Sequence, residues 1–339
     1  MKRDEVPGGQ KRQMHRTARE LGAVALLITL TGCGSGSPAA PEPEPVPEPD
    51  PLPTPISIPA QGTASTLDVA TWNVLYFGAQ NQGPRDEVLQ LARIRDVIRG
   101  TDADLWGLQE VTSATAFAAL LSELPGYAGL LANDSSVTDG TDFYTGGEQK
   151  VGIIYKTSVV AVTGAQVILT DFNYQFAGRP PLEVRIRLTL GGTAREAVVI
   201  VLHAKATADA ASWERRVAGA VALKDYIDAT RPDDLVLIPG DWNDDVDESI
   251  TLGRDTPYRP LVDAAPDWVY PTAELSAAGL TSILGYGDVI DHILASDEAM
   301  VSYEAGSAMV YRVDEHIPDY EDTTSDHLPV LVRFQPPGG

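Results

Sequence analysis

The chain has 339 residues, of which 43% are hydrophobic and 22% charged, a composition that excludes a protein disordered throughout. Its formal net charge of -23 argues against a protein that binds nucleic acid by bulk charge, because an acidic surface repels phosphate backbones at long range. A metal ion and a few basic residues in a cleft still bind phosphate locally, so a nucleic-acid substrate stays open.

Residues 1–33 have the pattern of a lipoprotein signal peptide. A basic stretch precedes the apolar run 23–30, which suits a signal-peptide core and is too short for a membrane span of about 20 residues. The sequence Leu30-Thr31-Gly32-Cys33 resembles a bacterial lipobox, and Cys33 is the only cysteine, so no disulfide within the chain is possible. We therefore predict lipidation of Cys33 and export to the cell envelope, at the outer membrane, cell surface or periplasm. An ordinary secretory signal is the alternative.

Residues 34–65 are predicted to form a flexible linker rich in Pro and Glu. From Gly34 to about Pro59 the sequence consists almost entirely of Gly, Ser, Ala, Pro and acidic residues, which favour an extended polyproline spacer because they have little to bury. Such a spacer would hold the domain predicted at 66–335 away from a membrane. Residues 336–339 are predicted to form a short tail.

From Thr66 onward, short apolar runs alternate with amphipathic stretches, which is typical of an α/β domain. Strands are predicted at 67–76, 103–109, 150–155, 182–190, 197–202, 234–238 and 328–334, and helices at 85–99, 113–124 and 209–229. Apolar and polar residues alternate through 182–190 and Gly191-Gly192 follows, so we predict an antiparallel hairpin with the next strand. Hairpins mixed with helices favour a four-layer sandwich of two mixed, largely antiparallel β-sheets packed face to face and flanked by helices.

Several predicted strands end in a polar residue. Asn73, Glu110 and His203 each follow an apolar run, and Asp241 and Asn243 follow another. Polar groups at the ends of neighbouring strands meet at one rim, where a rigid scaffold can build a cleft. Each residue alone also has a structural interpretation. The alternatives are an edge-strand amide for Asn73, a helix cap for Glu110, a core histidine for His203 and turn formers for Asp241 and Asn243.

Two segments near the carboxyl terminus strengthen the functional interpretation. Asp291-His292 and Ser325-Asp326-His327 each place an acid beside a histidine just before an apolar run. With them, the sequence from 67 to 334 resembles the endonuclease/exonuclease/phosphatase superfamily, in its deoxyribonuclease-like branch and its secreted bacterial nucleases. The remaining motifs of this resemblance stand in family order and are Thr71-Trp72-Asn73, Gln109-Glu110-Val111, Leu202-His203-Ala204-Lys205 and Gly240-Asp241-Trp242-Asn243.

The resemblance implies a role for each polar side chain of these motifs. It implies that His327 is the general base, that Asp291 orients it, and that Asp326 binds a metal ion. It also implies that His203 faces the scissile phosphate as an acid or an electrostatic stabiliser. The residues implied to orient the attacking water and a phosphate oxygen are Asp241 and Asn243. A carboxylate beside an imidazole suits this chemistry because it fixes the tautomer of a group that titrates near neutral pH.

The metal is predicted from the chemistry of the side chains. Glu110 offers a hard oxygen ligand of the kind that Mg2+ or Ca2+ prefers, and Asn73 offers a neutral one. The predicted domain contains no cysteine, which makes a zinc site less suitable. We therefore expect a divalent metal, Mg2+ first, with Ca2+ or Mn2+ as alternatives.

Arg179 is predicted to bind a substrate phosphate, because Arg179-Pro180-Pro181 resembles a strand that carries a phosphate-binding arginine in deoxyribonuclease. A strand entry with solvated arginines is the alternative. The sequence departs from that enzyme where a glutamate orients the histidine that matches His203. Here either Glu148 or Gln149 takes that position, so the partner of His203 stays open.

The residues together predict an exported, metal-dependent phosphodiesterase, and we favour a nuclease that hydrolyses extracellular DNA or RNA by in-line attack of water. One alternative is a phosphoesterase acting on lipid headgroups or inositol phosphates. Another is a non-catalytic binding lipoprotein, but such a protein would have lost a metal ligand or a histidine. We expect a monomer with nucleic acid as substrate, touching the membrane only through its lipid anchor.

Overall fold

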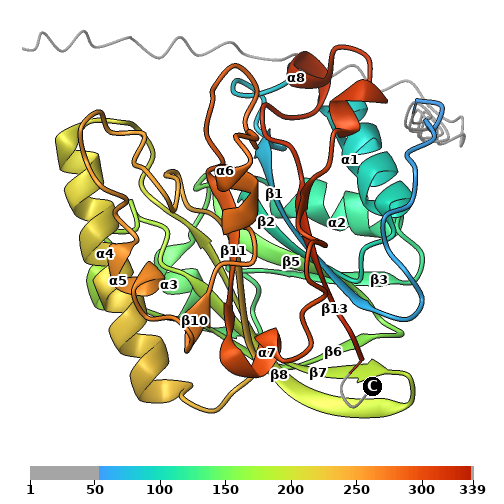
Figure 1. The fold of residues 1–339 in the computed structure, drawn as a ribbon. Helices are drawn as coiled ribbons and strands as arrows, with labels where there is room; N and C mark the ends of the chain where they lie inside the picture. The colour runs from blue at the N-terminus through green and yellow to red at the C-terminus, as the bar shows by residue number, and fades with distance from the viewer. Residues whose placement is uncertain (1–52, 337–339) are drawn as a thin grey trace, which may run out of the picture. The chain divides into compact units, whose positions relative to one another are not determined.

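Two β-sheets pack face to face in the computed structural model, which describes residues 53–336 (Figure 1). In order across the first sheet lie β12 (Met309–Val310), β13 (Val330–Phe334), β1 (Leu67–Phe77), β2 (Leu105–Val111), β5 (Lys150–Lys156) and β3 (Tyr127–Leu131). The second sheet contains β10 (Trp268–Val269), β11 (Asp291–Ser296), β9 (Val236–Asp241), β8 (Thr193–His203), β7 (Leu182–Leu190), β6 (Val160–Val167) and β4 (Val137–Thr138).

Both sheets mix parallel and antiparallel pairs. Strands β1 and β2 run parallel, as do β8 and β9, whereas β13, β5, β7 and β11 run antiparallel to their neighbours in the sheet. The predicted hairpin is confirmed, since β7 and β8 pair from Leu182 opposite Val201 to Leu190 opposite Thr193. Its alternation has the expected cause: the apolar residues of β7 are buried, while Arg185 and Arg187 are exposed.

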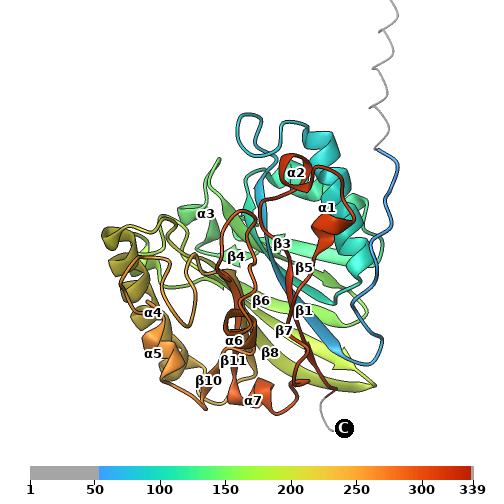
Figure 2. The same ribbon diagram turned by 45° about the horizontal axis from the view of Figure 1, so that its top comes forward.

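Helices cover the outer faces of both sheets, as Figure 2 shows with the top of the molecule turned forward. Helix α1 (Glu87–Thr101) and helix α2 (Ala114–Ser122) pack on the first sheet, and α4 (Ala210–Thr230) packs on the second. Side-chain caps from Asp86, Ser113 and Asp209 fix where these three helices begin. The short helices are α3 (Gly140–Phe143), α5 (Arg259–Val262), α6 (Ala273–Ala277), α7 (Asp297–Met300), α8 (Tyr320–Thr323), η1 (Thr170–Phe172) and η2 (Val313–Glu315).

The hydrophobic core follows these layers. Val69, Leu105 and Ile153 of the first sheet meet Val199 and Leu237 of the second in one buried cluster between the sheets. Separate clusters lie under α1 with α2 and under α4. The predicted four-layer α/β sandwich is therefore confirmed, because each sheet buries one face against the other sheet and one face against helices.

The packed domain begins earlier in the chain than predicted. We expected a flexible linker up to residue 65, but Ile58 is buried under α1 and the backbone N–H of Ile56 donates to Asp96 at 3.0 Å. Arg333 also donates to the carbonyl of Gln61 at 2.7 Å. Two apolar residues among the prolines, Ile56 and Ile58, therefore pack this segment against the domain. The predicted signal peptide with Cys33, the linker residues 34–52 and the tail residues 337–339 lie outside the described residues.

No helix within residues 53–336 combines the length and the apolar character that crossing a bilayer requires.

Candidate active site

The predicted site residues come together at one rim of the sandwich. Parallel strands end at the same edge of a sheet, so β8 and β9 bring His203 directly opposite Asp241. Strand β11 runs antiparallel to β9, and its first residue, Asp291, is therefore also opposite Asp241. In the first sheet, Asn73 lies within β1 and Glu110 is the last but one residue of β2, and the Asn73 amide donates to the Glu110 carboxylate. The rim is thus assembled from both sheets.

Asp241 lies at the centre of this group. Its Oδ2 accepts a hydrogen bond from the Asn73 amide at 2.9 Å and lies 3.3 Å from Nε2 of His203 and 3.9 Å from Nε2 of His327. Its Oδ1 accepts from the backbone N–H of Asn243 at 2.9 Å. Complete burial raises the pKa of Asp241 to about 7, against the attraction of His327. One carboxylate thus contacts the side chains predicted to handle the substrate and the proton.

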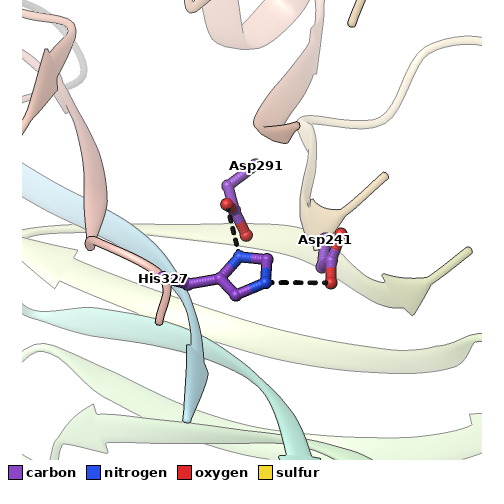
Figure 3. Close-up of side chains that lie close together, drawn as sticks. All are labelled: Asp241, Asp291 and His327. Carbon is purple, nitrogen blue, oxygen red and sulfur yellow. Dashed lines mark hydrogen bonds and ion pairs between the residues drawn. The ribbon is translucent and has the colours of Figure 1, made fainter. Parts of the chain in front are cut away.

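His327 and Asp291 form the predicted pair (Figure 3). Nδ1 of His327 donates to Oδ2 of Asp291 at 2.8 Å, and both side chains are buried. Ser282 donates to the same Asp291 oxygen at 2.7 Å. Because Asp291 holds the proton on Nδ1, Nε2 of His327 faces the site, 3.9 Å from Asp241 and 3.9 Å from Asp326. This orientation is the one a general base requires.

The surrounding carboxylates strongly affect this histidine. Burial on its own lowers the pKa of His327, but Asp291, followed by Asp241 and Asp326, outweighs burial and raises the pKa to about 10. An imidazole in this setting is protonated at neutral pH, whereas a general base must be neutral. Positive charge placed among these carboxylates would weaken their effect and lower the pKa of His327 toward the range in which it can accept a proton.

Glu110 is held in an unusual backbone conformation. Its φ of 64° lies in the left-handed region, and the pairing of β2 with β5 is irregular between Leu108 and Val111. Its carboxylate accepts from the backbone N–H of Tyr76 at 3.1 Å and from the Asn73 amide at 3.2 Å. A non-glycine residue in this region costs about 1–3 kcal/mol and persists where its surroundings hold it, often at functional sites.

The residues present fit a divalent cation. Asp241, Asp291 and His327 each offer one ligand atom, and these atoms lie within 4.8 Å of one another. Among residues 53–336, Oδ1 of Asp291 and Oδ1 of Asp326 are buried without a hydrogen-bond partner. Glu110 lies beside this cluster, with Oε1 3.8 Å from Nε2 of His203. Buried carboxylate oxygens that lack a donor are suited to a hard cation.

Asn73 connects two carboxylates of the site. Its amide nitrogen donates to Glu110 and Asp241, while its carbonyl oxygen accepts from the backbone N–H of Leu75 at 3.0 Å. The side chain therefore directs its donor to the carboxylates. Its predicted part in binding a metal ion stays a prediction.

His203 is hydrogen-bonded to neither of its two candidate partners, Glu148 and Gln149. Glu148 accepts from Thr145 and from the backbone of Gly146, and Gln149 accepts from Arg179, so neither contacts the histidine. Nδ1 of His203 is buried and has no hydrogen-bond partner among the residues described. The glutamate of deoxyribonuclease thus has no counterpart here, and Nε2 of His203 faces the acidic group instead.

Arg179 and Asn243 share an acceptor beside the site. Arg179 donates to the carbonyl of Ala204 at 3.0 Å, and the Asn243 amide donates to the same oxygen at 3.2 Å. Arg179 is 8% exposed, and its charge interacts with Glu110 and Asp241. Arg179 is therefore not a solvated arginine at the entry of a strand, which was the alternative to a role in phosphate binding.

Several supporting residues were not predicted. Ser325 donates to the carbonyl of Asn73 at 2.7 Å and accepts from the backbone of His327 at 3.0 Å, which links β1 to the loop before β13. Trp72 and Tyr320 both donate to the carbonyl of His327. Ser325 stands inside a recognised motif and so had a signal in the sequence. Ser282, which fixes Asp291, lies in a loop and had none.

A buried ion pair supports the loop after β8. Arg216 on α4 lies 2.7 Å from Asp244, with both side chains fully buried, and donates to the carbonyls of Lys205 and Thr207. We expect Asp244→Ala to destabilise the protein by about 3–5 kcal/mol, because an unpaired buried guanidinium remains. The melting temperature should fall by roughly 10 °C in calorimetry. A fall no larger than that of the exposed-pair variant Glu196→Ala, whose partner is Arg187, would contradict this account.

Comparisons with known proteins agree with the fold. The model of the Endonuclease/Exonuclease/phosphatase family matches residues 70–327. The catalytic domain of human Nocturnin has a similar fold, with a TM-score of 0.54 at 17% identity over 80% of this chain and 94% of that one. TDP2 from D. rerio, solved with a single strand DNA product, gives 0.56 at 14% identity over 80% and 99%.

A family protein from Bacteroides vulgatus gives a TM-score of 0.52 at 15% identity over 80% of this chain and 99% of that one. No curated protein matches the sequence. The superfamily consists mostly of hydrolytic phosphoesterases, among them nucleases, phosphodiesterases and phosphatases, and its enzymes typically depend on a divalent metal. The chain belongs to the Endonuclease/Exonuclease/phosphatase family.

Proposed function

We propose that the protein is an exported, metal-dependent phosphodiesterase, a nuclease that hydrolyses extracellular DNA or RNA by in-line attack of water. The observation that carries this proposal is the orientation of His327. Its Nδ1 is bonded to Asp291 at 2.8 Å, and its Nε2 faces Asp241 and Asp326 at the rim where Glu110 and His203 also lie.

Each side chain has a role that follows from its surroundings. His327 takes the proton of the attacking water on Nε2, and Asp291 stabilises the imidazolium that forms. Asn243 presents an amide without bringing another negative charge against the phosphate. Arg179 offers a buried guanidinium to a phosphate oxygen. When bound, a divalent cation would neutralise charge on the phosphoryl oxygens, on the leaving alkoxide and on the carboxylates that keep His327 protonated.

His203 is better suited to stabilising charge than to donating a proton as an imidazolium. Burial lowers its pKa well below the usual value, and the positive charges of Arg179 and His327 lower it further. The ring is therefore neutral at neutral pH. Its Nε2 lies 3.3 Å from Oδ2 of Asp241, an arrangement that favours the tautomer with its proton on this nitrogen, from which a hydrogen bond can be donated into the site. Of its two predicted roles, electrostatic stabiliser is the one we propose.

A panel of substrates tests this function. The purified full chain is assayed on plasmid DNA, RNA, sphingomyelin and inositol phosphates, with Mg2+ and with a chelator. We expect cleavage of nucleic acid that the chelator abolishes and added Mg2+ restores. Cleavage confined to sphingomyelin or inositol phosphates would replace the nuclease proposal by the lipid or inositol alternative, and activity that survives the chelator would remove metal dependence.

The site of action is proposed from the sequence. We expect the mature amino terminus to be Cys33 with a diacylglycerol on its thiol, because the only cysteine follows Leu30-Thr31-Gly32 after an apolar run. Mass spectrometry of the mature protein from membranes measures this directly, and Cys33→Ser should release the protein from the membrane fraction. An unmodified Cys33 or cleavage elsewhere would contradict anchoring.

A further inference from the structure

Three cations lie together beside the site. Arg179, Lys205 and Arg215 form no ion pair within residues 53–336, although the whole chain carries a net charge of -23. The charges of Arg179 and Arg215 both act on Lys205, and the carboxylate that opposes them, Asp209, is engaged by Thr207 and Ser212. Like charges that lie close together repel one another, and a bound anionic ligand removes this repulsion.

An exposed aromatic ring adjoins these cations. Tyr174 is 69% exposed, in the loop that follows η1. The guanidinium of Arg215 lies over this ring, 4.1 Å from its centroid, and Arg215 also donates to the Tyr174 carbonyl. One face of the ring is therefore covered by a cation, and most of the side chain remains open to solvent. Such a ring is a stacking surface for a base.

This surface is continuous with the active-site rim. Lys205 stands two residues after His203, and the intervening Ala204 carbonyl accepts from both Arg179 and Asn243. Arg216 holds the backbone of Lys205 through its carbonyl at 2.7 Å. Lys205 therefore lies next to the groups that face the phosphate, and its backbone is held by Arg216 of the buried ion pair.

The opposite side of the rim has the reverse charge. A groove of about 640 Å³ lies beside Asp326 and is bordered by loop residues 83–86 and by α8. Its lining residues include one arginine, Arg85, and four acids, namely Asp86, Glu321, Asp322 and Asp326. A polyanionic strand is repelled from this groove and attracted to the side of Lys205.

We propose that Tyr174, Arg215 and Lys205 form a subsite for an unpaired nucleotide next to the scissile phosphate, and that the substrate is therefore single-stranded nucleic acid crossing this side of the rim. The inference rests on the proposed nuclease function and names its substrate class. Tyr174 stacks on a base, which only an unpaired base allows, while Lys205 and Arg215 contact the adjoining phosphates.

Direct binding tests the subsite separately from catalysis. The full chain carrying His327→Ala, which is expected to bind without cleaving, is titrated against a fluorescent single-stranded oligonucleotide at several salt concentrations, with anisotropy as the readout. Adding Tyr174→Ala should raise Kd about tenfold, and Tyr174→Phe should restore it because the ring alone stacks. Adding Lys205→Gln should weaken binding and reduce the salt slope by about 0.7, the value for one lost phosphate contact on a single strand.

Matched controls lie on the acidic side. Arg85 is exposed there, and Tyr286 has the same 69% exposure as Tyr174 in the loop where Leu284 bonds to Asp326. Arg85→Gln and Tyr286→Ala should change Kd by less than about twofold, and Tyr174→Ala should hardly affect binding of a duplex. Equal effects on duplex and single strand, effects of the control pair alone, or no binding at all would overturn the subsite. If binding follows the prediction but the wild-type chain hydrolyses no phosphodiester, the proposed function fails instead.

Discussion

Glu110→Ala is expected to lower turnover of a DNA substrate at least about a thousandfold at saturating Mg2+. The carboxylate is nearly buried, is fixed by Tyr76 and Asn73, and lies beside Asp241 and His203. If Glu110 is the hard oxygen ligand that we predict, its removal takes away the metal's stabilisation of charge that develops on the phosphate. Steady-state kinetics over a range of Mg2+ concentrations measure the loss.

Two comparisons separate this effect from damage to the fold. Glu110→Gln keeps the size of the side chain and one of its two accepted hydrogen bonds while removing its charge, so turnover should stay low while the melting temperature falls by much less than turnover does. Glu148→Ala removes a carboxylate that contacts Thr145 and Gly146 away from His203, so turnover should stay within about twofold of wild type. Retention of more than about a tenth of wild-type turnover by Glu110→Ala would refute the metal assignment.

His327→Ala and Asp291→Ala should each reduce turnover by about a hundredfold to ten thousandfold, the range for a positioned general base. The two residues act as a unit through their 2.8 Å hydrogen bond, so the double variant should cost little more than either single one. Substrate affinity should barely change, because the pair contributes mainly in the transition state. A double-mutant cycle on turnover gives this coupling.

The neighbouring histidine provides the control for this cycle. His292 is fully buried and contacts Thr272 at 3.0 Å, the carbonyl of Val289 at 2.8 Å and Asp245 at 3.6 Å, none of which is a predicted site residue. His292→Ala should lower the melting temperature while the correctly folded fraction keeps its turnover. Additive losses in the cycle, or losses that follow melting temperature across all variants, would remove the catalytic pair.

Much of the fold was predictable because its signals are local. Alternation in 182–190, caps such as Asp86 before α1, and apolar runs that end in polar residues all depend on neighbours within a few positions. The rim was predictable for a related reason. Once the strands are known, chain direction places His203 opposite Asp241 at the ends of β8 and β9, and Asn73 opposite Gln109 in the parallel pair of β1 and β2.

The features that could not be predicted from the sequence depend on contacts between distant parts of the chain. The Asn73 amide is oriented by Asp241, 168 residues away, and no local pattern shows whether its oxygen or nitrogen faces the site. Gln149 was a candidate partner for His203, but its side-chain oxygen accepts a hydrogen bond from Arg179, 30 residues later in the chain. Strand β11 was not predicted as a strand. It is held by antiparallel pairing with β9, a contact between distant parts of the chain that no local pattern shows.

Hydrolysis in water enriched in oxygen-18 is the most direct test of the central claim, that this rim catalyses metal-dependent attack of water on a phosphodiester. The wild-type chain is given a defined single-stranded oligonucleotide with Mg2+, and the products are weighed by mass spectrometry. The account predicts one labelled oxygen on the phosphate of each cleaved bond, no product with a chelator, and none from His327→Ala within the same time. Unlabelled phosphate, a cyclic phosphate product, or equal cleavage in the presence of chelator would contradict it.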